Sequence, residues 1–184
     1  MGNTFTKFKL TALGACLTTA LAVGAVSTTV SASDHSNEVR AAQAAKISLQ
    51  QAITTASRDA SGILVSADFD DDDDRRSNSG VYELEFQNDS TSYEFTVDAT
   101  TGQIVESESE RLDRDDIEEY NVQQQAKIKA VDAIEIAEKH SNGRVLDIEF
   151  EDDNISRADH YEVKILKDSK ISQLHIDANT GAVN

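Results

Sequence analysis

The sequence contains an internal duplication, and this repeat is the strongest constraint on its fold. Residues 52–56 (AITTA) correspond to residues 133–137 (AIEIA) with an offset of 81 positions. Beyond an acidic turn the offset falls to 79, and residues 97–102 (VDATTG) correspond to residues 176–181 (IDANTG). A deletion in a polar loop accounts for this change, since loops tolerate changes of length. The chain is therefore expected to fold as two copies of one structural unit.

Each copy has the pattern of one helix followed by antiparallel strands. In the first copy, Leu49, Ile53 and Ala56 recur at helical spacing, and Ser48 with Gln51 matches a capping box. After the helix, apolar and polar residues alternate, which is typical of strands with one face on a core. The sequence predicts an α+β fold class with two tandem repeats, each a helix packed on a small antiparallel β-sheet. It does not decide whether the two copies pack together.

Equivalent residues in the two copies give more detailed expectations. Phe69 and Phe150 should lie buried under their helices, and Asp98 should accept main-chain N–H groups in a turn that Gly102 closes with positive φ. A short strand, residues 103–105, should follow this turn. A one-sided sheet that ends in such a strand leaves an edge able to pair with an extended peptide.

The first 32 residues have the pattern of a secretory signal peptide. Lys7 and Lys9 precede an apolar stretch over residues 10–26, and small residues end at Ala32. One alternative is an uncleaved membrane anchor, and another is lipidation of Cys16, because residues 13–16 (LGAC) resemble a bacterial lipobox. The apolar stretch continues past Cys16, which favours a cleaved signal, no stable membrane span afterwards, and a periplasmic or extracellular location.

The remaining boundaries follow from the repeat. Residues 33–45 form an N-terminal segment, residues 46–105 the first repeat and residues 126–184 the second. Residues 106–125 form an acidic linker, whose first part extends a strand and whose second part starts a short helix.

Charge and motifs exclude several classes of function. A net charge of -17 argues against a nucleic-acid partner, because phosphate binding needs a basic surface. The chain has no His-Glu-x-x-His motif, and its four histidines lack metal-ligand spacing. Cleavage after Ala32 would remove the only cysteine. We therefore expect no catalytic residues, no bound cofactor and no enzymatic activity. The second repeat also places three lysines around one hairpin, as a local basic patch: Lys164, Lys167 and Lys170.

One acidic segment is a candidate for weak Ca²⁺ binding, because this hard cation takes oxygen ligands. An EF-hand loop counted from its first aspartate would need glycine at the sixth position, which is Asp73. The alternative is a solvated loop partly neutralised by Arg75 and Arg76. The candidate metal ligands are Asp68, Asp70, Asp71, Asp72, Asp73 and Asp74.

The order of motifs in both copies resembles the PepSY domain. Each copy has an amphipathic helix, a glycine, a strand, then Tyr-Glu-Leu or Tyr-Glu-Val and an Asp-Ala-x-Thr-Gly ending. The resemblance covers roughly residues 46–105 and 126–184. It implies a helix packed on an antiparallel sheet. PepSY modules occur in propeptides of thermolysin-type metallopeptidases and in bacterial envelope proteins, so the resemblance implies a module that binds or restrains a peptidase.

Three functional hypotheses follow. The first is an exported, non-enzymatic binding module of the bacterial envelope whose partner is a protein or peptide. The second is a specific form of the first, an inhibitor or regulator of a secreted peptidase. The third is an acidic cation-responsive or structural envelope protein.

The signal-peptide interpretation predicts the N-terminus of the exported protein. Cleavage after Ala32 gives a chain that starts at Ser33 and has lost only Lys7 and Lys9. The product has 15 basic and 34 acidic residues, and a net charge of -19. N-terminal sequencing of exported protein should give Ser33, and a lipidated Cys16 or an intact signal would contradict the interpretation.

Overall fold

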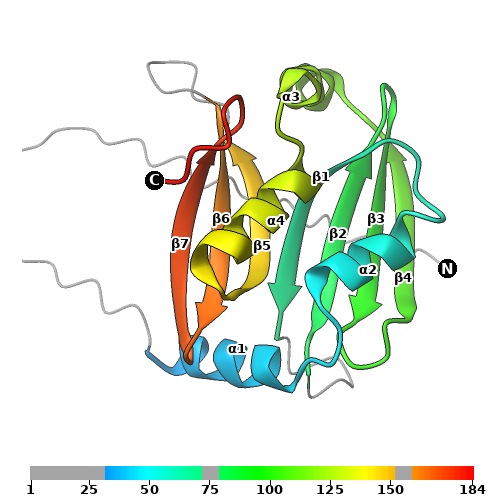
Figure 1. The fold of residues 1–184 in the computed structure, drawn as a ribbon. Coiled ribbons are helices and arrows are strands. Elements are labelled where there is room, and N and C mark those ends of the chain that lie inside the picture. Colours follow the sequence, from blue (N-terminus) through cyan, green and yellow to red (C-terminus); the bar gives the residue numbers. More distant parts are fainter. Residues whose placement is uncertain (1–31, 72–78, 152–158) are drawn as a thin grey trace, which may run out of the picture. The chain divides into compact units, whose positions relative to one another are not determined.

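A computed structural model describes residues 32–71, 79–151 and 159–184. Its helices and strands all belong to one compact unit, residues 31–184 (Figure 1). In chain order they are α1 (Ala32–Ala44), α2 (Leu49–Ala56), β1 (Ile63–Asp70), β2 (Val81–Gln87), β3 (Thr91–Asp98), β4 (Ile104–Arg111), α3 (Arg114–Gln125), α4 (Ala130–Ser141), β5 (Arg144–Glu151), β6 (His160–Lys167) and β7 (Lys170–Asp177).

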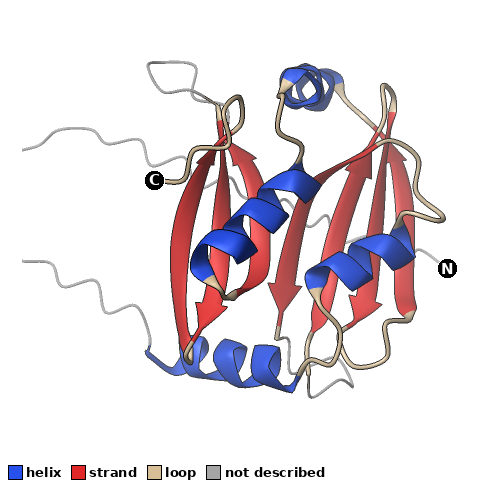
Figure 2. Ribbon diagram, viewed as in Figure 1, coloured by secondary structure: helices blue, strands red, loops and turns tan. Residues whose placement is uncertain are grey.

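The strands form a single seven-stranded antiparallel sheet with the order β4-β3-β2-β1-β5-β6-β7. Helices α2 and α4 cover the same face of this sheet, each over its own repeat (Figure 2). Their buried faces contain Leu49, Ile53 and Ile134, as the helical spacing predicts. The predicted α+β architecture of two helix-on-sheet repeats is confirmed.

The two repeats join through antiparallel pairing of β1 with β5. Ala67 lies opposite Ile148, and these two residues are equivalent in the duplicated sequence. An approximate two-fold axis therefore passes through this pair. Each strand also has an irregularity at the same place, between Leu64 and Ser66 in β1 and at the equivalent position in β5. The two copies therefore pack together, a question that the sequence left open, and each repeat covers one sheet edge of the other.

The Asp-Ala-x-Thr-Gly ending forms the same turn twice. Asp98 Oδ1 accepts hydrogen bonds from Thr100 N (3.0 Å) and Thr101 N (2.7 Å), and Gly102 has a φ of 71°. Asp177 accepts the equivalent bonds in the second repeat. The predicted turn geometry is confirmed, because an aspartate that accepts these main-chain groups fixes the conformation that glycine then completes.

This turn is also tied to the chain that enters each helix. The carbonyl oxygen of Ala99 accepts hydrogen bonds from Lys46 N and Ile47 N, and that of Ala178 accepts one from Ile128 N. A buried tyrosine strengthens each connection. Tyr82 Oη donates to the Ile47 carbonyl at 3.1 Å, and Tyr161 Oη to the Ile128 carbonyl at 2.9 Å. The repeated Tyr-Glu and Asp-Ala motifs thus share one structural role, which is to hold the helix entrance against the sheet.

The first turn of each helix is stabilised differently. Ser48 and Gln51 form the predicted capping box at the start of α2. Lys129 precedes α4 and caps no main-chain N–H group. Its Nζ instead donates to the carbonyl oxygens of Gln124 (2.7 Å) and Ala126 (2.8 Å), which fixes the link from α3.

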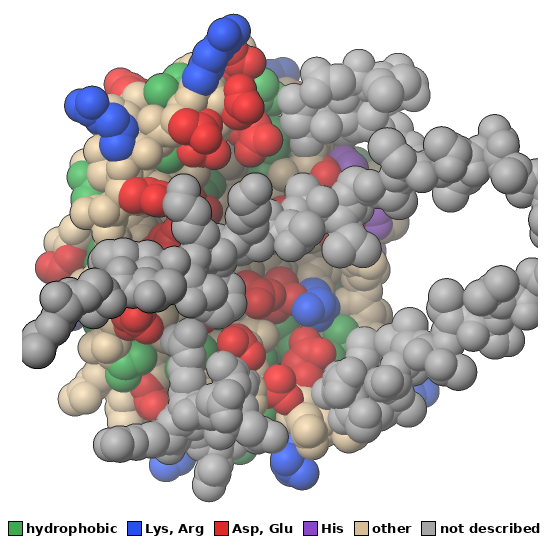
Figure 3. Space-filling view, turned by 180° about the vertical axis from the view of Figure 1, so that it is seen from behind, with side chains coloured by type: hydrophobic (Ala, Val, Ile, Leu, Met, Phe, Trp, Pro, Cys, Tyr) green, Lys and Arg blue, Asp and Glu red, His purple; other side chains and the backbone are tan. Residues whose placement is uncertain are grey.

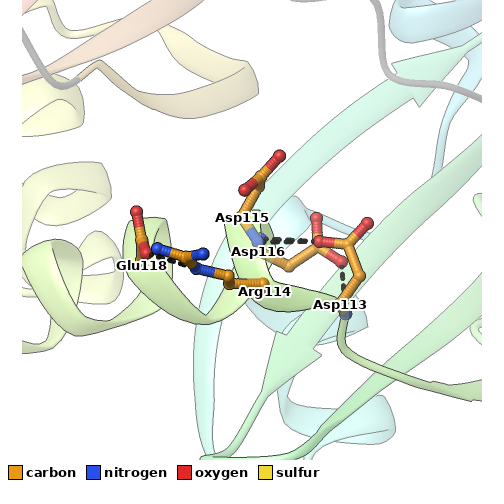
Figure 4. A network of polar contacts seen from close by, with 5 residues as sticks. All are labelled: Asp113, Arg114, Asp115, Asp116 and Glu118. Carbon is orange, nitrogen blue, oxygen red and sulfur yellow. Dashed lines mark hydrogen bonds and ion pairs between the residues drawn. The ribbon is translucent and has the colours of Figure 1, made fainter.

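The segment between the repeats contains the end of a strand and a helix, as the sequence predicts. Strand β4 runs to Arg111, so the strand predicted for residues 103–105 continues into the first part of the linker, as expected. Asp113 then caps α3 by accepting from Asp115 N and Asp116 N, beside an ion pair of Arg114 with Glu118 (Figure 4). Carboxylates in the first turn of a helix are favourable because the helix N-terminus is positive.

A buried amide connects helix α3 to the sheet. Gln123 Nε2 donates to the Val65 carbonyl of β1 at 3.0 Å. This bond satisfies a main-chain acceptor beside the strand irregularity. No helix in the described part of the chain is long and apolar enough to cross a membrane.

Helix α1 precedes the first repeat in the sequence but contacts the second. Ala41, Ala42 and Ala45 are buried in the common core. Arg144 Nη1 at the start of β5 donates to the carbonyl oxygens of Ala42 (2.7 Å) and Ala45 (3.3 Å), where a helix end is negative. Gln43 Nε2 donates to Ser169 Oγ at 2.8 Å. The helix therefore fastens the two repeats together outside the sheet.

The equivalent phenylalanines differ in burial, which gives a paired stability prediction. Phe69 is 3% exposed, whereas Phe150 is only half-buried, contrary to the expectation that both are buried. Each ring contacts its tyrosine edge-on at a centroid distance of 5.3 Å. Phe69→Ala should lower the free energy of unfolding by about 3–5 kcal/mol. Phe150→Ala should lower it by about 1–2 kcal/mol, because less apolar surface is lost from the core. Urea unfolding of both variants tests this order, and equal losses would contradict it.

Candidate functional site: the acidic sheet face and its open edge

The sheet face opposite α2 and α4 is strongly acidic. Alternation along the strands directs apolar residues to the helices and carboxylates to this second face. Figure 3 shows carboxylate side chains gathered over the visible part of it. The strand registers place the following carboxylates there: Asp68, Asp70, Glu83, Glu85, Glu94, Glu106, Glu108, Glu110, Asp147, Glu149, Glu151 and Glu162.

Three of these carboxylates form a row across adjacent strands. Glu94 of β3 lies directly opposite Glu85 of β2 on one side and Glu108 of β4 on the other. Like charges opposite one another destabilise a sheet. Glu85 is held by Ser92 Oγ at 2.6 Å and Gln87 Nε2 at 2.7 Å. Loss of surrounding water, followed by the charges of neighbouring glutamates, raises the pKa of Glu94 above its ordinary value. The row therefore brings three like charges together on adjacent strands.

A second cluster lies where the two repeats meet. Asp147 Oδ1 accepts a hydrogen bond from Phe69 N at 3.0 Å, so a carboxylate replaces a carbonyl in the β1–β5 pairing. The other oxygen of Asp147 forms an ion pair with Lys164 Nζ, which also lies 3.4 Å from Glu38 Oε1 of α1. One lysine thus connects the second repeat with the N-terminal helix, and sequence reasoning missed this role because the three partners are distant in the chain.

Asp68 adjoins this cluster from β1. Burial among neighbouring atoms, then the charge of Asp147 and a hydrogen bond with it, raise the pKa of Asp68 to about 8. Lys164 partly opposes this rise. Part of the Asp68 side chain is exposed, so water screens these interactions. The upward direction follows from two carboxyl groups in contact, because both cannot ionise without repulsion.

The predicted Ca²⁺ ligands are only partly within the described residues. Asp68 and Asp70 lie on the acidic face of β1 and Asp71 follows the strand, whereas Asp72, Asp73 and Asp74 lie outside the described residues. Among the residues that the structure describes, no group of three or more carboxylates, histidines or cysteines is arranged to hold a metal ion. Ca²⁺ binding by the whole segment stays a prediction.

Two histidines on the acidic face lie closer together than the sequence indicated. His160 of β6 and His175 of β7 stack with ring centroids 5.0 Å apart and an angle of 13° between planes. They are diagonal neighbours, since His175 lies opposite Glu162 and His160 opposite Asp177. Their separation in the sequence hides this contact, which strand register creates.

Two lysines of the predicted basic patch have partners within the protein. Lys164 lies in the ion-pair cluster of Asp147 and Glu38. Lys167 Nζ donates to the Ser141 carbonyl at 2.6 Å and so stabilises the end of α4. The lysines at positions 167 and 170 are exposed, so a local basic patch at this hairpin stays a prediction, whereas Lys164 is paired with carboxylates.

The two outer edges of the sheet are not equivalent. On β7, His175 exchanges main-chain hydrogen bonds of 2.9 and 3.2 Å with Asn184, so the end of the chain covers part of that edge. On β4, no described strand lies beyond the outer edge, and the strand is exposed over most of its length. The sequence predicted an edge strand here. The alternating glutamates and serines of β4 include no apolar residues, so the sequence did not show where this strand ends.

The ladder register shows which groups of β4 point outward. Leu112 N donates to the Ser90 carbonyl at 3.0 Å, and antiparallel pairs alternate between bonded and unbonded. Glu108, opposite Glu94, therefore directs its main-chain groups inward to β3, whereas Ser107 and Ser109 direct theirs outward. The edge combines outward main-chain donors and acceptors with glutamates on one face.

A cavity of about 310 Å³ lies on the opposite face, between α2 and α4. Its lining contains Ile53, Phe86 and Val131 and no carboxylate, histidine or cysteine. The polar side chains of the lining belong to Thr54, Ser57, Lys129 and Tyr161.

The contact of Asp68 with Asp147 predicts a pH-dependent stability. The folded protein favours the protonated form of Asp68, because the pKa of this group is higher in the folded than in the unfolded protein. The stability that this protonation provides is complete below about pH 4, the pKa of Asp68 in the unfolded chain, and is lost as the pH rises through about 8. Asp68→Asn removes the charge and should raise the melting temperature at pH 9 by about 2–4 °C, allowing for solvent screening. It should have little effect at pH 3.5.

Thermal unfolding of Asp68→Asn and of a control, Asp59→Asn, measures this effect. The control removes one charge outside the cluster. An equal rise in melting temperature for both variants, or no rise for Asp68→Asn at high pH, would show that the carboxyl contact is unimportant.

Comparison with known proteins connects this structure to a family. Residues 46–108 and 127–183, more than half of the chain, match the family described as Peptidase propeptide and YPEB domain, PepSY. A comparison with curated proteins gives no significant match. Among solved structures, the chain is similar to a "putative lipoprotein" from Clostridium difficile 630, with 24% identity and a TM-score of 0.48 over 80% of this chain and 97% of that one. The chain therefore belongs to the PepSY family and has two copies of the domain in tandem.

Proposed function

We propose that this chain is an exported, non-enzymatic binding module that holds an extended segment of another protein along strand β4. The outward main-chain groups of Ser107 and Ser109 carry this proposal, because an open strand edge supplies regularly spaced donors and acceptors for an added strand. The signal-peptide pattern of residues 1–32 supports export.

A secreted peptidase is the candidate partner. The PepSY resemblance implies a module that binds or restrains peptidases, and peptidase clefts bind extended chains. Strand β4 and its neighbours could therefore occupy such a cleft, or capture an extended segment at the rim of it. In either case the module acts by binding, with its sheet as a rigid support.

A second candidate function is a response to cations. The row of Glu85, Glu94 and Glu108 repels itself and would be relieved by bound cations. A Ca²⁺-dependent rise in melting temperature would favour this alternative, together with the predicted ligands Asp68, Asp70, Asp71, Asp72, Asp73 and Asp74.

Titration of the mature chain into secreted peptidases of the same organism tests the proposal, with and without Ca²⁺. At least one peptidase should bind and be inhibited, and Ser109→Pro should weaken binding by about tenfold or more, because proline removes an outward N–H from the edge. Gln173→Pro, which removes an outward N–H from β7, is the matched control and should leave binding unchanged.

The outcomes separate the alternatives. Loss of binding with Ser109→Pro but not with Gln173→Pro supports capture at β4, provided that circular dichroism shows both variants folded. Binding that both variants retain would place the contact elsewhere on the module. Absence of binding and inhibition across the set would contradict the peptidase hypothesis.

A further inference from the structure

We propose that the β4 edge selects an extended peptide segment with lysine or arginine at every second position. This inference rests on the proposed function and names the chemistry of its ligand. The binding site is the outer main-chain edge of β4, and the glutamates beside this edge favour a positively charged ligand.

The register of an added strand determines where its side chains lie. Side chains of β4 alternate, with Glu106, Glu108 and Glu110 on the acidic face and Ser107 and Ser109 on the helix-bearing face. A strand paired with β4 would place its alternate residues directly beside the glutamates, at the distance of a cross-strand pair. Basic residues at positions i, i+2 and i+4 fit this row, and small uncharged residues fit beside the serines.

The glutamates of β4 lie at the end of a longer acidic array. Glu108 continues the row of Glu94 and Glu85, and Glu106 lies on the far side of Thr96 from Glu83. A cationic strand would reduce repulsion along both rows. It would also neutralise charge on a face where loss of water already raises the pKa of Glu94. The attraction should therefore be strongest for a ligand that presents its charges on one face.

Other occupants of this edge fit less well. A second copy paired through β4 would place glutamates beside glutamates, which opposes self-association. The β7 edge of a second copy is partly covered where His175 pairs with Asn184. A neutral segment could use the main-chain groups but would add no positive charge beside the glutamates of β4. A basic segment satisfies both the main chain and the charges.

Synthetic peptides with matched composition test the pattern of charge. The first probe is the heptapeptide Lys-Thr-Lys-Val-Lys-Thr-Lys, and the second is Lys-Lys-Lys-Lys-Thr-Val-Thr. A third, Ser-Thr-Ser-Val-Ser-Thr-Ser, keeps the extended character without charge. Binding to the mature chain is measured by fluorescence polarisation at low and moderate salt, and amide exchange at Ser107 and Ser109 reports pairing at the edge.

The alternating peptide should bind at least about tenfold more tightly than the other two, and its affinity should fall with salt. It should slow amide exchange at Ser107 and Ser109. Glu108→Lys should weaken it by about tenfold or more, because a like charge then lies opposite the ligand. Asp132→Asn, which removes a charge from α4, is the control and should leave the affinity unchanged.

Equal affinities for the alternating and contiguous lysine peptides would overturn the inference, since charge alone would then explain binding. The inference would also be overturned if the uncharged peptide bound as tightly as the alternating lysine peptide, slowed amide exchange at Ser109 and lost affinity with Ser109→Pro. In that case capture at the β4 edge, and hence the proposed function, would stand. Binding of no peptide, or concentration-dependent self-association through β4, would contradict the inference directly.

Discussion

The rest of the structure depends on the pairing of β1 with β5. This contact turns two small helix-on-sheet units, each with limited apolar surface, into one sheet with a common core. Its regular part centres on Ala67 and Ile148, and Asp147 extends it by accepting the N–H of Phe69. An ionised carboxylate in that position needs a cation, which Lys164 supplies. The side chain of Asp147 thus extends the short β1–β5 ladder. Lys164, its ion-pair partner, also contacts Glu38 of α1.

Local patterns in the sequence predicted the local structure well. The capping box of Ser48 with Gln51, the turn at Asp98 and the apolar faces of both helices all follow from short-range chemistry. Extension of a strand into the acidic linker was expected, but its end at Arg111 was not, because alternating serines and glutamates have no apolar side to mark a strand. The incomplete burial of Phe150 was also missed, since equivalent positions in a repeat need not have equivalent surroundings.

The candidate site was less predictable than the fold. A one-sided sheet with an edge could be inferred from alternation, but the rows of carboxylates require strand register, which sequence alone leaves open. The cluster of Glu38, Asp147 and Lys164 joins three elements that are far apart in the chain. The sequence alone does not show where a charged residue of an acidic protein lies in the fold, so the partners of Lys164 and Lys167 became visible only in the structure.

The approximate two-fold axis through Ala67 and Ile148 has a consequence for how such a protein can evolve. Two identical chains paired in this way would have identical outer strands, and any change to one would appear in the other. Joining the units in a single chain removes that restriction. In this chain β4 runs to Arg111 with glutamates on one face, whereas the residues equivalent to its start, 182–184, form only an isolated bridge with β7. Gene fusion therefore permits a division of labour that a symmetric dimer cannot achieve.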